Sequence, residues 1–377
     1  MTRIYQRLFG HIDLVLIGAL VPILAAGLAT MHSFVDTDIF FNRQIVWILI
    51  SFFAFITVSF FDAKILRRTR VIMWLYVIIS LVLVSLFFFG AVFQGAQSWL
   101  DFGFFAVQPA EIAKLVLILL LAKYFSRRHV EIRNIRHIIV SGVYAAIIFF
   151  LILIQPDFGS AIIIFLLWFG MVLLSGIDKK HLGLVMFAGI SLIVIMWAFV
   201  FADYQKARIM TFLNPLQDIQ GTGYNAYQSV ISVGSGQVLG KGFGYGTQSR
   251  LEFLPEYQTD FIFAAFSEEW GFVGVSILLI LYAIILSRIL HYAITAATNF
   301  EAFYAVGYAL LLMSHLIIHI GMNIGLLPVT GLSIPFMSYG GTHMLMLFIG
   351  LGILMGMRRY GSVVHKDAIS NEFIGPR

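Results

Sequence analysis

The sequence contains no cysteine among its 377 residues, and only 11% of its residues are charged. The absence of cysteine excludes a disulfide framework, thiol catalysis, iron–sulfur ligation and cysteine-ligated zinc. An ordinary soluble domain is roughly 25% charged, and so few charged side chains cannot cover a soluble fold of this length. The composition therefore excludes a soluble globular enzyme and indicates a protein that lies in a lipid bilayer.

Nucleotide-binding motifs are also missing from the sequence. Lys241 follows Gly240, but Ser235 stands where a phosphate-binding loop needs its first glycine, and Gly242 stands where it needs Ser or Thr. A net charge of +5 gives no sign of a nucleic-acid partner, and we expect none.

The histidines form no recognisable metal motif. His315 and His319 lie four residues apart in one apolar stretch and His343 lies in the next, without a His-Glu-x-x-His pattern. Packing within the helices is the favoured interpretation of these three side chains.

Long apolar stretches dominate the sequence, which is 60% hydrophobic. Each stretch is about 17 to 25 residues long, the length that a helix needs to cross roughly 30 Å of hydrocarbon. We therefore predict an all-α, polytopic membrane protein with about ten transmembrane helices, forming a single integral membrane domain over residues 1–377. The predicted spans are 12–29, 44–61, 71–93, 109–125, 138–154, 158–176, 182–202, 261–286, 303–327 and 336–357.

Basic residues gather in the connections on one side of the predicted bundle. The side that holds the amino terminus carries Arg67, Lys123, Lys179, Arg288 and Arg358, with further Lys and Arg near them. Cytoplasmic loops carry an excess of Lys and Arg. Both termini are therefore predicted to be cytoplasmic.

One connection, residues 203–260, is far longer than the others and falls on the outer side of the predicted membrane. Loops of this length are usually functional or disordered. Its aromatic residues argue against disorder, and alternating glycines at Gly240, Gly242, Gly244 and Gly246 permit tight turns. We predict an ordered extracytoplasmic loop between the seventh and eighth spans.

Ionisable groups within the predicted spans mark candidate functional sites, because burying charge in lipid is costly. Glu111 and Lys114 lie three residues apart near the outer end of the fourth span, where they share a helix face and can pair. Two interpretations remain open: an ion pair that fixes helix packing, or a polar wall of an outer cavity that receives a charged headgroup.

Three acidic residues, Glu252, Glu256 and Asp260, stand four apart at the end of the long connection. One of them can serve as a general base at the membrane surface if burial or a neighbouring carboxylate raises its pKa. The alternative for Asp260 is capping of the eighth helix, which would lower its pKa. Glu268 and Glu269, two turns into that span, are candidates for packing, pairing or chemistry.

Residues 331–341 interrupt the apolar pattern between the last two spans and include Ser338. Broken backbone at membrane depth is tolerated where protein or a water-filled cavity surrounds it. The segment is therefore either a second wall of the site or a simple connecting loop.

Four segments, in order along the chain, resemble the SEDS family (shape, elongation, division and sporulation), which includes RodA, FtsW and SpoVE. The similarity covers nearly the whole chain, and the short cytoplasmic ends resemble the RodA branch. The matching segments are Gln108-Pro109-Ala110-Glu111-Ile112-Ala113-Lys114, Gln155-Pro156-Asp157-Phe158-Gly159-Ser160, Leu254-Pro255-Glu256 with Thr259-Asp260-Phe261-Ile262-Phe263-Ala264, and 325–331 running to Ser338-Tyr339-Gly340-Gly341.

The resemblance implies a peptidoglycan glycosyltransferase that polymerises glycan strands from lipid II on the outer face of the cytoplasmic membrane, for cell elongation and rod shape. Asp260 corresponds to the family's catalytic aspartate, which would deprotonate the acceptor sugar hydroxyl. The resemblance also implies a divalent cation, Mg²⁺ or Mn²⁺. The implied partners are a class B penicillin-binding transpeptidase, the elongation machinery and membrane lipids.

The expelled lipid pyrophosphate would need cationic stabilisation. Lys114, Arg208, Lys241 or Arg250 can supply it. The full set of candidate substrate-binding residues is Glu111, Lys114, Glu256, Lys241, Arg250, Arg208 and Ser338.

Three positions depart from the family pattern. Ser98 stands before Trp99 where an arginine is common, His319 stands where an asparagine is usual, and His343 stands where a small residue is usual. None of them is the candidate base, so the departures concern the contacts to the headgroup.

Two other functions are compatible with the sequence. A flippase for the lipid-linked precursor would need polar residues through the whole depth of the membrane. A scaffold would recruit a partner without chemistry of its own.

Overall fold

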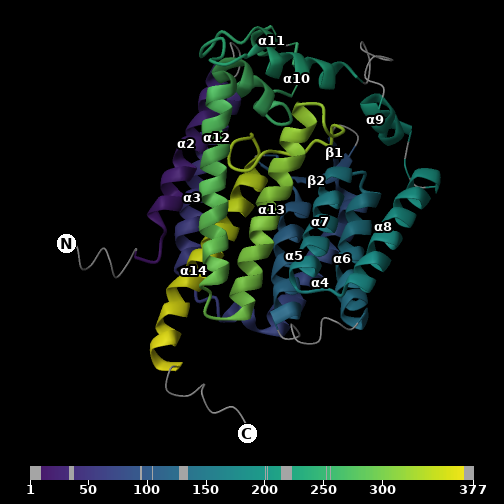
Figure 1. Ribbon diagram of the computed structural model, residues 1–377, viewed down its shortest axis with the longest axis vertical. Coiled ribbons are helices and arrows are strands. Elements are labelled where there is room, and N and C mark those ends of the chain that lie inside the picture. The colour runs from purple at the N-terminus through teal and green to yellow at the C-terminus, as the bar shows by residue number, and fades with distance from the viewer. Residues whose placement is uncertain are drawn as a thin grey trace.

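The computed structural model describes residues 10–33, 38–93, 96–103, 105–126, 135–199, 201, 203–213, 223–251, 253–254 and 256–368. Within these residues the chain forms a bundle of long helices (Figure 1). The helices of the bundle are α2 (Leu14–His32), α3 (Asp38–Ser59), α4 (Thr69–Phe89), α5 (Pro109–Ser126), α6 (Ile135–Ile154), α7 (Phe158–Leu174), α8 (Lys179–Phe199), α12 (Ile262–Ile294), α13 (Asn299–Asn323) and α14 (Gly341–Ala368), with the short 3₁₀ helix η1 (Ile65–Arg67) between α3 and α4.

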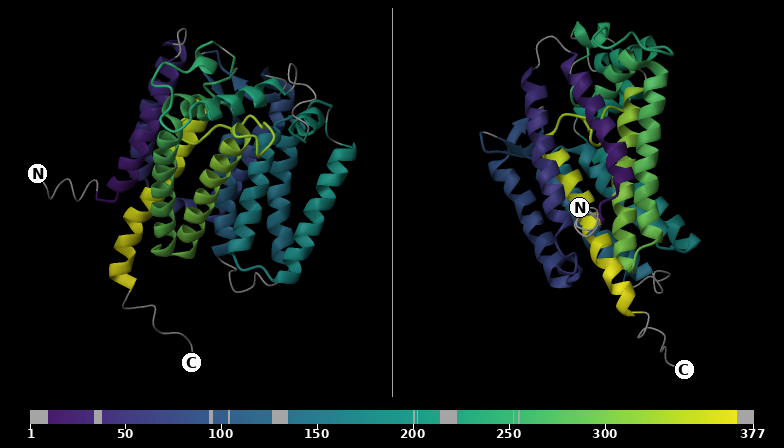
Figure 2. Two further views of the ribbon diagram at one scale, coloured as in Figure 1. Left: turned by 45° about the horizontal axis from the view of Figure 1, so that its top comes forward. Right: turned by 90° about the vertical axis from the view of Figure 1, so that its left-hand side faces the viewer.

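The bundle is apolar both inside and outside. Helix α13 lies at its centre, packed against α5, α7 and α12, while α14 runs along α3 and α2 packs on α12. Large side chains point away from the protein: Phe53, Phe89 and Phe199 are 74%, 79% and 85% exposed. Helices that are apolar on all sides are stable only where their outer faces meet lipid. Figure 2 shows the bundle from two further sides.

Eight helices are long and apolar enough to cross a membrane within the described residues: α2, α3, α4, α6, α8, α12, α13 and α14. Helix α7 is apolar but shorter. Helix α5 carries Glu111, Lys114 and Lys123 among its 18 residues. When α5 and α7 are counted with the other eight helices, each of the ten predicted spans corresponds to one helix. The predicted all-α, multi-pass membrane fold is therefore confirmed.

Several predicted boundaries were wrong. Helix α4 ends at Phe89 rather than at residue 93, because Gly90 is extended and the following residues form a strand. Helix α12 continues to Ile294 rather than to residue 286, and α14 begins at Gly341 rather than at residue 336. Hydropathy alone cannot locate these ends, since the flanking residues are themselves apolar.

In the described part of the chain between α4 and α5, three short strands form a small antiparallel sheet in the order β1-β2-β3. They are β1 (Ala91–Phe93), β2 (Ala96–Asp101) and β3 (Ala106–Val107). The register pairs Ala91 with Trp99 and Leu100 with Val107. The sheet leads directly into Pro109, the first residue of α5, where a proline costs no helical hydrogen bond.

The described residues of the long connection form three further helices, α9 (Asp203–Leu213), α10 (Tyr224–Ser235) and α11 (Thr247–Arg250). Helices α10 and α11 lie across one end of the bundle, at the top of Figure 1, which we call the loop end. Gly240 has a φ of +80°, and a Cβ on it would lie 2.1 Å from the carbonyl oxygen of Glu269. This turn therefore needs glycine, and it holds the connection against the first turns of α12.

The chain between α13 and α14, called here the 324–340 segment, enters the interior of the bundle near the loop end (Figure 1). It is not helical, yet Ile334, Phe336 and Met337 are buried. The Tyr282 hydroxyl donates to the Pro335 carbonyl across 2.5 Å. Buried irregular backbone of this kind needs protein partners within a membrane, and here the helices supply them.

Candidate active site

Asp260 lies at the loop end, two residues before α12 begins at Ile262. The carbonyl of Glu256 accepts the N–H groups of Thr259, Asp260 and Phe261 at 3.1, 3.0 and 3.3 Å, which closes a tight turn. The N-cap of α12 is Phe261, without a side-chain capping bond. The capping interpretation of Asp260 was therefore wrong, and its carboxylate stays available for other contacts.

Two side chains from distant parts of the sequence hold this turn in place. The Asn323 amide donates to the Asp260 carbonyl across 3.0 Å, while its oxygen accepts the Ala264 N–H at 3.2 Å. The Ser338 hydroxyl donates to the Thr259 carbonyl across 2.9 Å. The backbone on both sides of the Asp260 side chain is thus fixed to α13 and to the 324–340 segment.

The environment of the Asp260 carboxylate raises its pKa. Burial is the largest cause and the nearby Glu256 carboxylate adds to it, so that the pKa rises from 3.8 to about 6, although Arg208 opposes the shift. The side chain keeps partial access to solvent. A Cβ on Gly331 would lie 3.6 Å from Asp260 Oδ2, so the 324–340 segment passes directly beside the carboxylate.

Arg208 comes to this site from α9. Its guanidinium is exposed and donates to the Val329 carbonyl across 3.5 Å. Arg208 also acts electrostatically on Asp260, so a cation lies near the carboxylate. Such a pair can serve a reaction in which a proton is removed and a negative leaving group departs.

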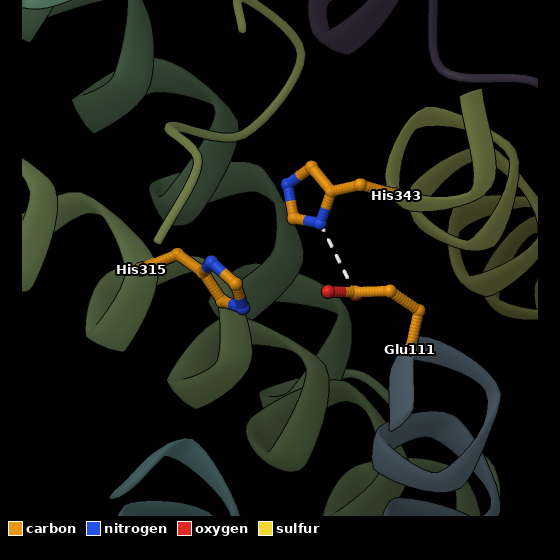
Figure 3. A group of neighbouring side chains, drawn as sticks. All are labelled: Glu111, His315 and His343. Atoms are coloured by element: carbon orange, nitrogen blue, oxygen red, sulfur yellow. Dashed lines mark hydrogen bonds and ion pairs between the residues drawn. The ribbon is translucent and has the colours of Figure 1, made fainter. Parts of the chain in front are cut away.

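A second polar group lies inside the bundle, at the first turns of α5. Lys114 Nζ is 2.7 Å from Glu111 Oε1 and 3.3 Å from His315 Nε2, and its side chain is fully buried. His343 Nδ1 lies 3.1 Å from Glu111 Oε2. The predicted pairing of Glu111 with Lys114 is confirmed. Figure 3 shows Glu111, His315 and His343 turned toward one another from α5, α13 and α14.

The 324–340 segment joins the two polar groups. Gly331 passes beside the Asp260 carboxylate. The carbonyl of Leu332 then accepts the His319 ring at 2.6 Å, and that of Ser333 accepts the His315 ring at 3.1 Å. These contacts fall on three consecutive residues, so one short stretch of backbone touches both groups.

Comparison with known proteins adds an independent observation. A family model covering FtsW, RodA and SpoVE, described as cell cycle protein, matches residues 5–362. The chain belongs to the FtsW/RodA/SpoVE family. This finding confirms the family resemblance that the four sequence segments indicated.

Named relatives and solved structures agree with this family assignment. Peptidoglycan glycosyltransferase MrdB of Escherichia coli K12 is 40% identical over 299 residues, which cover 78% of this chain and 79% of the relative. The rod shape determining protein RodA of Thermus thermophilus superposes with a TM-score of 0.70 at 26% identity, over 92% of this chain and 96% of the other. A chain of a peptidoglycan synthase complex, described as coordinating polymerisation and crosslinking, superposes with a TM-score of 0.79 at 27% sequence identity. The superposition covers 93% of this chain and 98% of the other.

Lys241, another candidate cation in this FtsW/RodA/SpoVE protein, has a partner other than Asp260. Its ammonium lies 2.6 Å from Glu268 Oε1. The N–H groups of Thr247 and Gln248 donate to the same oxygen at 2.8 and 3.1 Å. Glu268 thus has a pairing role that fastens α11 to α12.

The remaining predicted candidates either support the backbone of the site or lie outside the described residues. Ser338 is buried, and its hydroxyl donates to the Thr259 carbonyl and accepts the Ile334 N–H, which is a supporting role. The side chain of Arg250 and the whole of Glu252 lie outside the described residues.

Two features of the site were not predicted. One is Asn323, which holds the backbone at Asp260; its only sequence signal is a polar residue four positions after His319 in an apolar helix. The other is the meeting of Glu111 with His315 and His343; the two histidines were expected to pack within their own helices. One ligand atom from each of these three residues lies within 4.8 Å of the others, so they can hold a metal ion.

The donor set discriminates among metals. Mg²⁺ prefers oxygen ligands in octahedral geometry, whereas one carboxylate and two imidazoles suit Mn²⁺, Fe²⁺ or Zn²⁺. Of the two cations that the family resemblance implied, the residues Glu111, His315 and His343 therefore fit Mn²⁺ and not Mg²⁺.

Proposed function

We propose that this protein is a peptidoglycan glycosyltransferase that polymerises glycan strands from lipid II during cell elongation, with Asp260 as the general base. The observation that carries the proposal is the Asp260 carboxylate itself. It is partly buried, its pKa is raised to about 6, and its backbone is held by Asn323 and Ser338 at the loop end. The relative named a peptidoglycan glycosyltransferase, at 40% identity, supports the choice of reaction.

The chemistry follows from the position of the carboxylate. Ionised Asp260 accepts the proton of the acceptor sugar hydroxyl, whose oxygen attacks the anomeric carbon of the donor. A new carbon–oxygen bond forms as the bond to the lipid pyrophosphate breaks. A base with a pKa of about 6 is mostly ionised at neutral pH and still close enough to that pH to take up a proton.

Arg208 is the favoured cation for the leaving pyrophosphate. Its guanidinium is exposed beside the 324–340 segment and acts on Asp260. Guanidinium groups bind phosphate oxygens with two parallel hydrogen bonds. Lys114 is fully buried and paired with Glu111, and Lys241 is paired with Glu268. These pairings make the two lysines weaker candidates.

A divalent cation has a defined place in this proposal. Glu111, His315 and His343 would hold it, and it would supply positive charge near the 324–340 segment.

We assign the loop end to the outer face of the cytoplasmic membrane. Arg67, Lys123, Lys179 and Arg288 lie near helix termini at the opposite end, where the positive-inside rule places cytoplasmic connections. Lipid II would then approach with its tail in the bilayer and its sugars at Asp260. A class B penicillin-binding transpeptidase is the proposed partner, since a similar chain occurs in a synthase complex that polymerises and crosslinks.

A lipid II flippase is the alternative function. A transport path would need polar side chains through the depth of the membrane. Two ion pairs with buried carboxylates instead lie toward the two ends of the bundle: Glu111 with Lys114 near the loop end, and Asp13 with Arg288 near the other. Polymerisation therefore fits the distribution of charge better.

Reconstitution separates the candidate functions. The purified protein is placed in liposomes with lipid II and a cognate class B transpeptidase whose catalytic serine is removed. Glycan polymers on a gel are the expected result. Inversion of lipid II without polymer would favour the flippase, and polymer only after addition of a separate glycosyltransferase would favour the scaffold.

A further inference from the structure

Glu111, His315 and His343 form a buried group that does not itself take part in the proton transfer at Asp260. One ligand atom from each lies within 4.8 Å of the others, and all three side chains are buried. They come from α5, α13 and α14, so their meeting is a product of the tertiary fold (Figure 3). Clusters of one carboxylate with two imidazoles are a common ligand set for divalent transition metals.

The hydrogen bonds of His315 orient it as a metal ligand would be oriented. Its Nδ1 lies 3.1 Å from the Ser333 carbonyl, and a carbonyl can only accept, so Nδ1 carries the proton. Nε2 then presents its lone pair to the centre of the group, where Lys114 Nζ lies 3.3 Å away. Metal-binding histidines commonly fix their second nitrogen on a backbone carbonyl in this way.

His343 faces Glu111 through Nδ1, and its second ring nitrogen, Nε2, is turned away from Glu111 (Figure 3). Its Nδ1 pairs with Glu111 at 3.1 Å, while its Nε2 is buried without a hydrogen-bond partner among the described residues. The ring is only 6% exposed. Nδ1 is therefore the nitrogen through which His343 would bind an ion shared with Glu111.

We propose that Glu111, His315 and His343 form a binding site for a divalent transition-metal ion of the Mn²⁺ or Zn²⁺ type, and that the ion and the Lys114 ammonium exclude one another from it. The present structure shows the ammonium in place, 2.7 Å from Glu111 Oε1. A divalent ion together with a charged lysine would leave two net positive charges beside one carboxylate in an apolar interior, which is strongly unfavourable. The site therefore holds either cation, but not both.

The test measures metal binding directly and does not depend on the glycosyltransferase proposal. Protein without a histidine tag, in detergent micelles, is dialysed against Mn²⁺ or Zn²⁺, and bound metal is counted by mass spectrometry. The wild type should bind one equivalent more than His343→Ala. His137→Asn is the matched control, because His137 is also a buried histidine but lies near the start of α6 and contacts Tyr124. It should bind as the wild type does.

Competition is tested with Lys114→Met, which removes the ammonium and keeps an apolar chain of similar length. This variant should bind the metal at least about tenfold more tightly than the wild type, and excess Mg²⁺ should not displace it. Added metal should also raise its melting temperature more than that of the wild type.

Equal metal content in the wild type and His343→Ala would overturn the proposed site. If Lys114→Met did not fold, the comparison of the wild type with His343→Ala would still decide whether the metal site exists. Unchanged affinity in a folded Lys114→Met variant would overturn the competition with lysine.

Discussion

The side-chain amide of Asn323 donates a hydrogen bond to the backbone carbonyl of Asp260 across 3.0 Å. Asn323 is the last residue of α13, and its amide oxygen also accepts the N–H of Ala264 in α12. One side chain thus joins the end of one membrane helix to the start of another. The direction in which the Asp260 carboxylate points depends on this link.

Removal of this link should impair catalysis more than folding. Asn323→Ala should lower kcat/KM for lipid II polymerisation by about tenfold to a hundredfold, because a small displacement of a catalytic group has large kinetic effects. The loss of buried hydrogen bonds should lower the free energy of unfolding by only about 1–3 kcal/mol. Ser229→Ala is the control, since Ser229 bonds to Asn323 but not to Asp260. Equal losses of activity in both variants would contradict the positioning role.

The rate of polymerisation should depend on pH through Asp260. Since the base must be ionised and its pKa is about 6, the rate should fall as the pH drops below about 6. Glu256→Gln removes a like charge, so this fall should move to lower pH by about half a unit or more. Arg208→Ala removes a cation and should move it to higher pH. Profiles of rate against pH for the three proteins check the prediction, and identical midpoints would contradict it.

The same raised pKa predicts that the catalytic carboxylate destabilises the fold. Its pKa in the folded state is above the ordinary value of 3.8, so ionisation of Asp260 destabilises the folded protein. This loss of stability develops as the pH rises from about 4 through 6. Asp260→Asn imitates the protonated form. At pH 7.5 it should raise the free energy of unfolding by up to about 3 kcal/mol, and by less if solvent screens the carboxylate.

Thermal unfolding at two pH values tests this effect. The difference between Asp260→Asn and the wild type should be clear at pH 7.5 and smaller at pH 4.5, where Asp260 is mostly protonated in the folded protein. A variant less stable than the wild type at pH 7.5 would show that the carboxylate supports the fold instead.

The buried ion pair of α5 should behave as a unit. Glu111→Gln leaves the fully buried Lys114 without its countercharge, and Lys114→Met likewise leaves the buried Glu111 without a lysine countercharge. Each single change should cost about 3–5 kcal/mol of stability, whereas the double variant should cost less than the sum of the two. Melting temperatures of the four proteins in detergent check this. Additive losses would mean that the two groups do not depend on each other.

The fold was largely predictable because each membrane helix can be recognised from one continuous apolar stretch of the sequence. Helix α5 was predicted to within one residue, since Pro109 marks its start. The strand at Ala91–Phe93 was missed, because its apolar residues continue the pattern of α4. Hydropathy records burial in lipid, but it does not record where the backbone stops being helical.

The contacts of the site were predictable only where the two residues lie close together along the sequence. Glu111 and Lys114 lie three residues apart, so their pairing follows from the helical repeat. Asp260 was found as an acid at the end of a long loop. The contact of Asp260 with Asn323 spans 63 residues, and that of Glu111 with His343 spans 232. No local pattern can reveal such contacts, because the packing of the whole bundle creates them.

The most direct measurement is the rate of lipid II polymerisation by Asp260→Asn, in liposomes with the cognate transpeptidase. The matched control is Asp101→Asn, the same change at an exposed acid of β2. Asparagine keeps the shape of the side chain but cannot accept the proton, so the account predicts a loss of at least about a hundredfold. The control should keep most of its activity at pH 7.5. Polymerisation at the wild-type rate by a folded Asp260→Asn protein would contradict the central claim.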